Sequence, residues 1–139
     1  MGNNPFIQSI DPEKIPVVVY CANPKVGDLL HKCLEQVGFT QVKVANDEGV
    51  ALQEMEEFLP RLVIIVADLS DPLSLATAHR IHKKRVPTNR QTPKVLALIK
   101  PDANDLLRAK EEGYWDIIPL PTTPQTLGNR LETVMTRID

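Results

Sequence analysis

Residues Arg61–Pro72, RLVIIVADLSDP, are the most informative segment of the sequence about the class of fold. Its apolar run, residues 62–67, is mostly β-branched, and a polar, turn-forming cluster follows at once. Such a run predicts a strand buried on both faces, which is typical of the centre of a parallel sheet covered by helices. Ligand sites in these sheets lie just beyond the carboxyl ends of the strands. Asp68, Ser70 and Asp71 are expected at that end.

Strand and helix patterns alternate along the rest of the chain. Apolar runs predict further strands at 17–21, 42–44, 95–99 and 115–118. Apolar positions repeat with helical spacing in 26–37, 52–59, 75–81, 106–110 and 127–138. Strict alternation with right-handed crossovers predicts the α/β class. We expect a doubly wound, five-stranded parallel sheet of the flavodoxin-like (βα)5 type, with strand order 2-1-3-4-5.

The length of 139 residues and the apolar content of 42% are sufficient for one core. Residues 1–15 contain several asparagines and prolines and no periodicity, so they predict an extended tail before a single domain at 16–139. The sequence shows no export signal or membrane span, and Cys21 and Cys33 match no metal or disulfide pattern. We therefore expect a cytoplasmic protein with free thiols.

The formal charge of −2 gives no reason to expect a membrane or nucleic acid as a partner, but the charges are segregated locally. Residues 47–57 carry only acids, and residues 72–101 carry only bases. These segments either neutralise each other on neighbouring helices, or the basic part at 79–90 docks an acidic partner or, as the less favoured alternative, nucleic acid. The candidate contacts in that part are Arg80, Lys83, Lys84 and Arg85.

Three segments resemble the receiver domain of two-component response regulators, over residues 15–138. They are VVVYCANPKVGDLLHKCLEQVGF at 17–39, LPRLVII at 59–65 and EEGYWDIIPLP at 111–121. The resemblance implies two acids after the first strand, a threonine or serine after the fourth and a lysine after the fifth. The matching positions here hold Cys21 and Ala22, Leu98, and Leu120. Phosphoryl transfer needs a divalent cation and a basic side chain, and these residues supply neither.

The position of the family's phosphoacceptor aspartate has two readings. Counting forward from Pro60 places Val66 there, and counting back from Pro72 places Asp68 there. Residues two apart on a strand share a face, so Asp68 also reaches this region. We favour Val66.

The resemblance predicts a phosphorylation-independent pseudo-receiver that serves as a protein–protein interaction module in bacterial signal transduction. It is not expected to be an enzyme or to hold a metal or cofactor. The partner would be a signalling protein or a second copy, bound through the fourth helix, fifth strand and fifth helix, with Tyr114 and Trp115 as contacts. One alternative is an atypical response regulator phosphorylated on Asp68. A second is a small-ligand binder with an apolar pocket lined by Val66, Leu98 and Leu120.

Overall fold

The computed structural model describes residues 10–87 and 91–137. One parallel sheet has the order β2-β1-β3-β4-β5, which confirms the predicted class and strand order. The strands are β1 (Val17–Tyr20), β2 (Val42–Ala45), β3 (Leu62–Asp68), β4 (Lys94–Ile99) and β5 (Asp116–Leu120). The α-helices are α1 (Pro24–Val37), α2 (Glu48–Glu57), α3 (Pro72–Lys83), α4 (Ala103–Glu111) and α5 (Pro124–Thr136).

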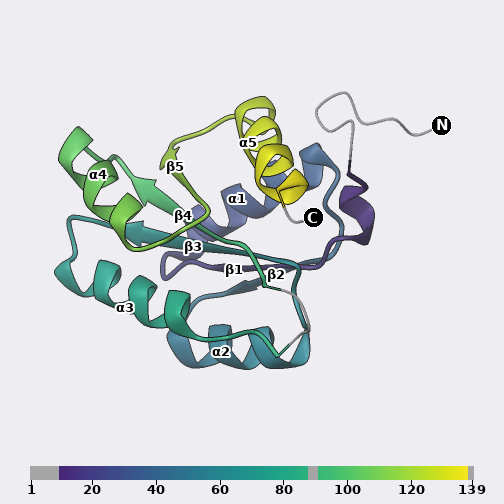
Figure 1. Ribbon diagram of the computed structural model, residues 1–139, viewed down its shortest axis with the longest axis horizontal. Helices are drawn as coiled ribbons and strands as arrows, with labels where there is room; N and C mark the ends of the chain where they lie inside the picture. Colours follow the sequence, from purple (N-terminus) through teal and green to yellow (C-terminus); the bar gives the residue numbers. More distant parts are fainter. Residues whose placement is uncertain (1–9, 88–90, 138–139) are drawn as a thin grey trace.

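Helices cover both faces of the sheet. Figure 1 shows α1 and α5 on one side and α2 and α3 on the other, and α4 adds Leu106 and Ala109 to the core on the α2–α3 side. Alternate residues of β3 enter the two cores: Ile64 and Val66 pack toward α1 and α5, whereas Ile65 packs toward α2 and α3. Complete burial of such side chains contributes about 1.5–3 kcal/mol each, so β3 is the centre of the fold.

The helices begin where the sequence provides capping side chains. Asn23, Asp71 and Thr123 occupy the N-cap positions of α1, α3 and α5, and each is followed by a proline at the start of the helix. Their side-chain oxygens accept backbone N–H groups that lack a partner in the first turn. These caps place the starts of α1 and α3 beside the carboxyl ends of β1 and β3.

Two segments differ from the sequence-based expectation. In the predicted tail, residues 10–15 include a 3-10 helix at Pro12–Lys14 and bury Ile15 in the α1–α5 core, while residues 1–9 lie outside the described part. The last strand continues through Pro119, where the prediction ended it. Because β5 is an edge strand, Pro119 needs no partner for the N–H it lacks.

Three leucines expected on buried helical stripes are exposed instead: Leu29 of α1 by 67%, Leu107 of α4 by 62% and Leu59 by 45%. Leu59 lies beyond the end of α2 and has a positive φ of 51°, which turns the chain away from the helix. The terminal contact expected of Ile138 lies outside the described residues. Among the helices of residues 10–87 and 91–137, none is both long and apolar enough to cross a bilayer.

Candidate functional site

A cleft of about 720 Å³ lies at the carboxyl ends of β1 and β3. It is formed where these strands lead into α1 and α3, the place that the sequence pattern predicted for a ligand site. Its lining consists of Tyr20, Cys21, Ala22, Asn23, Pro24, Lys25, Val66, Asp68, Asp71, Leu73, Ser74, Thr77 and Ile99.

The end of β1 supplies no carboxylate to this cleft. Cys21 is 1% exposed, and its thiol donates a hydrogen bond to the carbonyl oxygen of Asn23 at 3.2 Å. Burial raises the pKa of the Cys21 thiol, which keeps it protonated and unreactive. Ala22 is exposed and offers no side-chain ligand.

Asp68 is a half-buried carboxylate held within its own turn. Its Oδ1 accepts hydrogen bonds from the hydroxyl of Ser70 at 2.7 Å and from the backbone N–H of Ser70 at 3.0 Å. The backbone N–H of Asp68 donates to Ser74 Oγ at 2.8 Å. The hydrogen bonds from Ser70, followed by the positive charge of Lys100, lower the pKa of Asp68. The carboxylate is therefore ionised and has intramolecular partners.

Asp71 has a structural role. Its Oδ1 accepts the backbone N–H of Leu73 at 3.0 Å and caps α3. Its carboxylate thus stabilises the first turn of the helix beneath the cleft.

The strand register bears on the two readings of the acceptor position. The β1–β3 pairing ends at Tyr20 opposite Ile65, so Cys21 and Val66 are the next residues on the two strands. Both belong to the α1–α5 core, and Val66 is only 3% exposed. Asp68 lies two residues further along β3 and also lines the cleft. Of the two readings of the acceptor position, the register therefore places Val66, and not Asp68, beside the end of β1.

The prediction that Val66, Leu98 and Leu120 line one apolar pocket is wrong. Leu98 is fully buried in the core on the α2–α3 side, opposite to the side that Val66 faces. Leu120 lines a separate groove of about 420 Å³ against α1, together with Val26, Leu29, Leu30 and Cys33.

Ile99 borders both the cleft and the groove, and the sequence analysis missed it. The period of two along β4 places Ala97 and Ile99 on the α1–α5 side, so this alternation was the available signal.

The residues at the cleft do not fit the magnesium centre of the family. Mg²⁺ prefers hard oxygen ligands, and the two positions after β1 hold a thiol and a methyl group. The two aspartates of the cleft, Asp68 and Asp71, are engaged in turn and cap hydrogen bonds. Within the described part of the chain, no group of three or more histidine, cysteine, aspartate or glutamate side chains is arranged to hold a metal ion.

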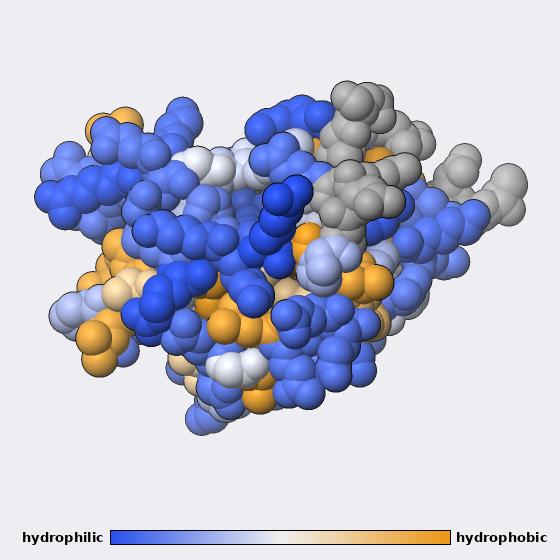
Figure 2. Space-filling model, turned by 60° about the horizontal axis from the view of Figure 1, so that its bottom comes forward, coloured by the Kyte–Doolittle hydropathy of each residue, from blue (hydrophilic) through white to orange (hydrophobic). Residues whose placement is uncertain are grey.

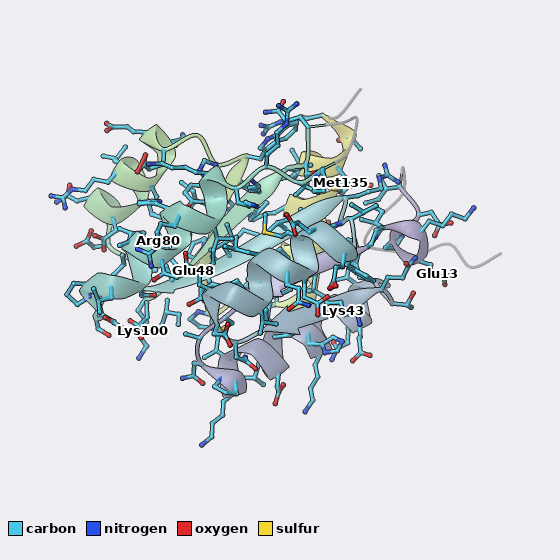
Figure 3. All side chains as sticks on the ribbon, turned by 90° about the horizontal axis from the view of Figure 1, so that it is seen from below. Glu13, Lys43, Glu48, Arg80, Lys100 and Met135 are labelled. Atoms are coloured by element: carbon cyan, nitrogen blue, oxygen red, sulfur yellow. The ribbon has the colours of Figure 1, made fainter. Side chains whose placement is uncertain are left out.

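The segregated charges of α2 and α3 meet on one face. Arg80 forms a two-pronged ion pair with Glu48, with N–O distances of 2.8 and 2.9 Å, and the two side chains lie side by side in Figure 3. Lys84 lies 3.7 Å from Glu56. Figure 2 brings this face forward and shows it covered mostly by hydrophilic residues. Two of the four candidate contacts, Arg80 and Lys84, are therefore neutralised by glutamates of α2.

Tyr114 is buried, contrary to its expected role as a partner contact. It is 8% exposed, its hydroxyl lies 2.9 Å from His79 Nδ1, and its ring lies 4.1 Å from that of His82. Trp115 is partly buried, and the guanidinium of Arg137 lies over its ring at 5.1 Å. Tyr114 thus fixes α3 to the segment before β5, and little of its surface remains for a partner.

Comparisons with known proteins agree with this architecture. The phosphate regulon transcriptional regulatory protein PhoB of Escherichia coli is 32% identical over 105 residues, which is 76% of this chain and 44% of PhoB. The non-phosphorylated HemR receiver domain of Leptospira biflexa is 25% identical, with a TM-score of 0.65 over 88% of this chain and 95% of that one. A putative pilus assembly-related protein of Burkholderia pseudomallei is 17% identical, with a TM-score of 0.69 over 94% and 95%. No family model matches the chain.

The sheet order and these similarities show that the chain has the fold of response-regulator receiver domains. It spans less than half the length of the curated relatives it matches, 44% in the case of PhoB. The resemblance stated from the sequence is thereby confirmed.

Proposed function

We propose that this receiver domain works without phosphorylation, as a protein–protein interaction module in bacterial signal transduction, and that it is not an enzyme. The observation that carries the proposal is the end of β1, where Cys21 and Ala22 replace the acidic pair of the family. Cys21 is buried and its thiol is hydrogen-bonded to the backbone, so this position supplies no cation ligand.

The electrostatics of phosphoryl transfer support this proposal. Charge that develops on the transferred phosphoryl group must be stabilised by a cation and by a basic side chain. Leu120 occupies the family's lysine position and packs in the apolar groove against α1. Val66, the residue beside the end of β1, is buried and carries no nucleophile.

The alternative is an atypical response regulator phosphorylated on Asp68. In its favour, Asp68 lies on the rim of the cleft, and the charge of Lys100 acts on its carboxylate. Against it, the hydrogen bonds from Ser70 already occupy Oδ1. A phosphoryl group would therefore attach through Oδ2, and the end of β1 offers no carboxylate to hold a cation beside it.

The partner would be another signalling protein in the cytoplasm, or a second copy of the chain. The receiver family suggests the face of α4, β5 and α5 for this contact. On that face Leu107 is 62% exposed, and Trp115 is partly exposed beside Arg137. Nucleic acid and membrane are not proposed as partners.

A phosphodonor assay tests the proposal. The purified chain would be incubated with acetyl phosphate and Mg²⁺, and its intact mass measured, with an active receiver domain as positive control. We expect no added phosphoryl group. A phosphoryl adduct that disappears in Asp68→Asn would replace the proposal by the alternative.

A further inference from the structure

A second hollow lies at the opposite, amino end of the sheet, where α3 ends and the chain enters β4 and β5. It has a volume of about 560 Å³ and is polar. Its lining consists of His82, Lys83, Arg85, Val86, Gln91, Thr92, Lys94, Gly113 and Trp115. This lining contains three cationic side chains and a histidine but no carboxylate, although the whole chain has a formal charge of −2.

The basic residues around the end of α3 separate into two sets. Arg80 and Lys84 face α2 and pair with its glutamates. Lys83 and Arg85 are exposed, line the hollow and take part in no ion pair within residues 10–87 and 91–137. Successive helical residues are about 100° apart around the axis, which explains how Lys83 and Lys84 face different surroundings. Lys83 and Arg85 therefore carry positive charge into the hollow that no ion pair of the described residues neutralises.

Lys94 gives this hollow a fixed wall. It is only 9% exposed, and its ammonium group donates to the carbonyl oxygen of His82 at 2.6 Å and also to that of Lys84. An ammonium group has three N–H donors, so one remains for a further acceptor. These bonds also hold the end of α3, which carries Lys83 and precedes Arg85.

We propose that this hollow is a binding site for a small phosphate-class oxyanion, either free phosphate or the phosphate group of a small ester. Lys83 and Arg85 supply charge-assisted hydrogen bonds from one side, and an arginine fork matches two oxygens of such a group. The largely buried Lys94 lines the inner part of the hollow, and Trp115 offers an apolar surface for the organic part of an ester. The volume is in the range of small-molecule sites, about 300–1,000 Å³. The site is separate from the cleft at the carboxyl ends of the strands.

Trp115 is the only tryptophan of the chain and lines the hollow, so its fluorescence reports on the site. We would titrate the protein with inorganic phosphate and with glycerol phosphate, against sodium chloride at matched ionic strength. A saturable change with either phosphate and none with chloride is expected. Comparing the two affinities shows whether the site prefers free phosphate or a phosphate ester.

Matched variants locate the site. Lys83→Gln combined with Arg85→Gln should weaken phosphate binding at least about tenfold, which corresponds to 1.4 kcal/mol. Lys84→Gln removes a neighbouring charge that faces α2, and it should change the affinity less than about twofold. Arg85→Lys keeps the charge and should retain most of the binding. Far-ultraviolet circular dichroism confirms that each variant is folded, which is expected because all three side chains are exposed.

Three results would overturn this inference. The first is no saturable, phosphate-specific change at millimolar ligand. The second is an equal loss in Lys84→Gln, which would indicate general charge screening. The third is a short DNA duplex that binds through the same residues much more tightly than phosphate and with steep salt dependence, which would indicate a nucleic-acid surface. None of these results depends on whether Asp68 is phosphorylated.

Discussion

The two ends of the sheet differ in how their charges are satisfied. At the carboxyl end, small or apolar side chains occupy positions where the receiver family has acids and a lysine, and Asp68 and Asp71 bond within their own turns. At the amino end, Lys83 and Arg85 lack carboxylate partners within the described residues. The carboxylates at the carboxyl end are therefore held by the chain itself, whereas Lys83 and Arg85 at the amino end have no carboxylate partner in the described residues. The amino end is therefore the more favourable of the two for binding an external anion.

The largest expected effect comes from restoring an acid to the carboxyl end. Val66→Asp places a carboxylate at a position that is 3% exposed, beside the thiol of Cys21. Without a cation, the free energy of unfolding should fall by about 3 kcal/mol or more. Urea unfolding measures this effect, with Val66→Ala as a control for lost packing. If Mg²⁺ returned Val66→Asp to wild-type stability, the carboxyl end would hold a cation after all.

The next largest effect is expected for Lys94, which lines the hollow at the amino end. Lys94→Met removes two hydrogen bonds to carbonyl oxygens at the end of α3, and it should cost about 2 kcal/mol of unfolding free energy at neutral pH. Chemical denaturation of the two proteins in parallel measures the difference. An equal or higher stability of Lys94→Met would show that the buried ammonium group only destabilises the fold.

The same pair of proteins predicts a pH dependence. Burial lowers the pKa of Lys94 from 10.5 to about 8. Between these two values the unfolded chain binds more protons than the folded one, so the contribution of Lys94 to stability increases as the pH rises. The difference in unfolding free energy between wild type and Lys94→Met should therefore widen from pH 7 to pH 10. A constant or shrinking difference would contradict the buried position of the amine.

A smaller effect is expected for Asp68→Asn. The amide oxygen retains an acceptor for Ser70, so the loss in unfolding free energy should stay below about 1 kcal/mol. Because the pKa of Asp68 is lowered in the fold, its charge stabilises the protein above the unfolded pKa, and this contribution is lost as the pH falls through the folded pKa. Thermal unfolding at neutral and acidic pH measures both effects. A large loss at neutral pH would mean that Asp68 has partners beyond its own turn.

The smallest effect should come from Arg80→Gln. Its pair with Glu48 is exposed to solvent, so the melting temperature should change little in low salt and not at all in high salt. A salt-independent drop would show that the contact between α2 and α3 depends on this pair.

The fold could be predicted from local sequence because the apolar periods and the caps each concern a few neighbouring residues. The cleft was predicted because ligand sites in such sheets lie beyond the carboxyl ends of the strands, and Asp68 and Asp71 line it there. The pocket of Val66, Leu98 and Leu120 failed because the direction of each side chain depends on register and alternation across strands. Leu98 faces the other core, and Ile99 takes the position at the cleft.

The hollow at the amino end could not be predicted from the sequence, for a different reason. It combines Lys83 and Arg85 with Lys94 and Trp115, which come from separate parts of the chain. The basic segment was visible in the sequence, but which of its charges are paired depends on the packing of α2 against α3. Only the structure separates Lys84 from its neighbour Lys83.

Whether the domain works without phosphorylation can be tested by amide NMR spectra with and without Mg²⁺ and beryllofluoride, a mimic of the phosphoryl group, for wild type and Asp68→Asn. We expect unchanged spectra at millimolar ligand for the residues around the carboxyl-end cleft. Shifts centred on residues 66–72 and 98–100 that vanish in Asp68→Asn would contradict it and establish Asp68 as the acceptor.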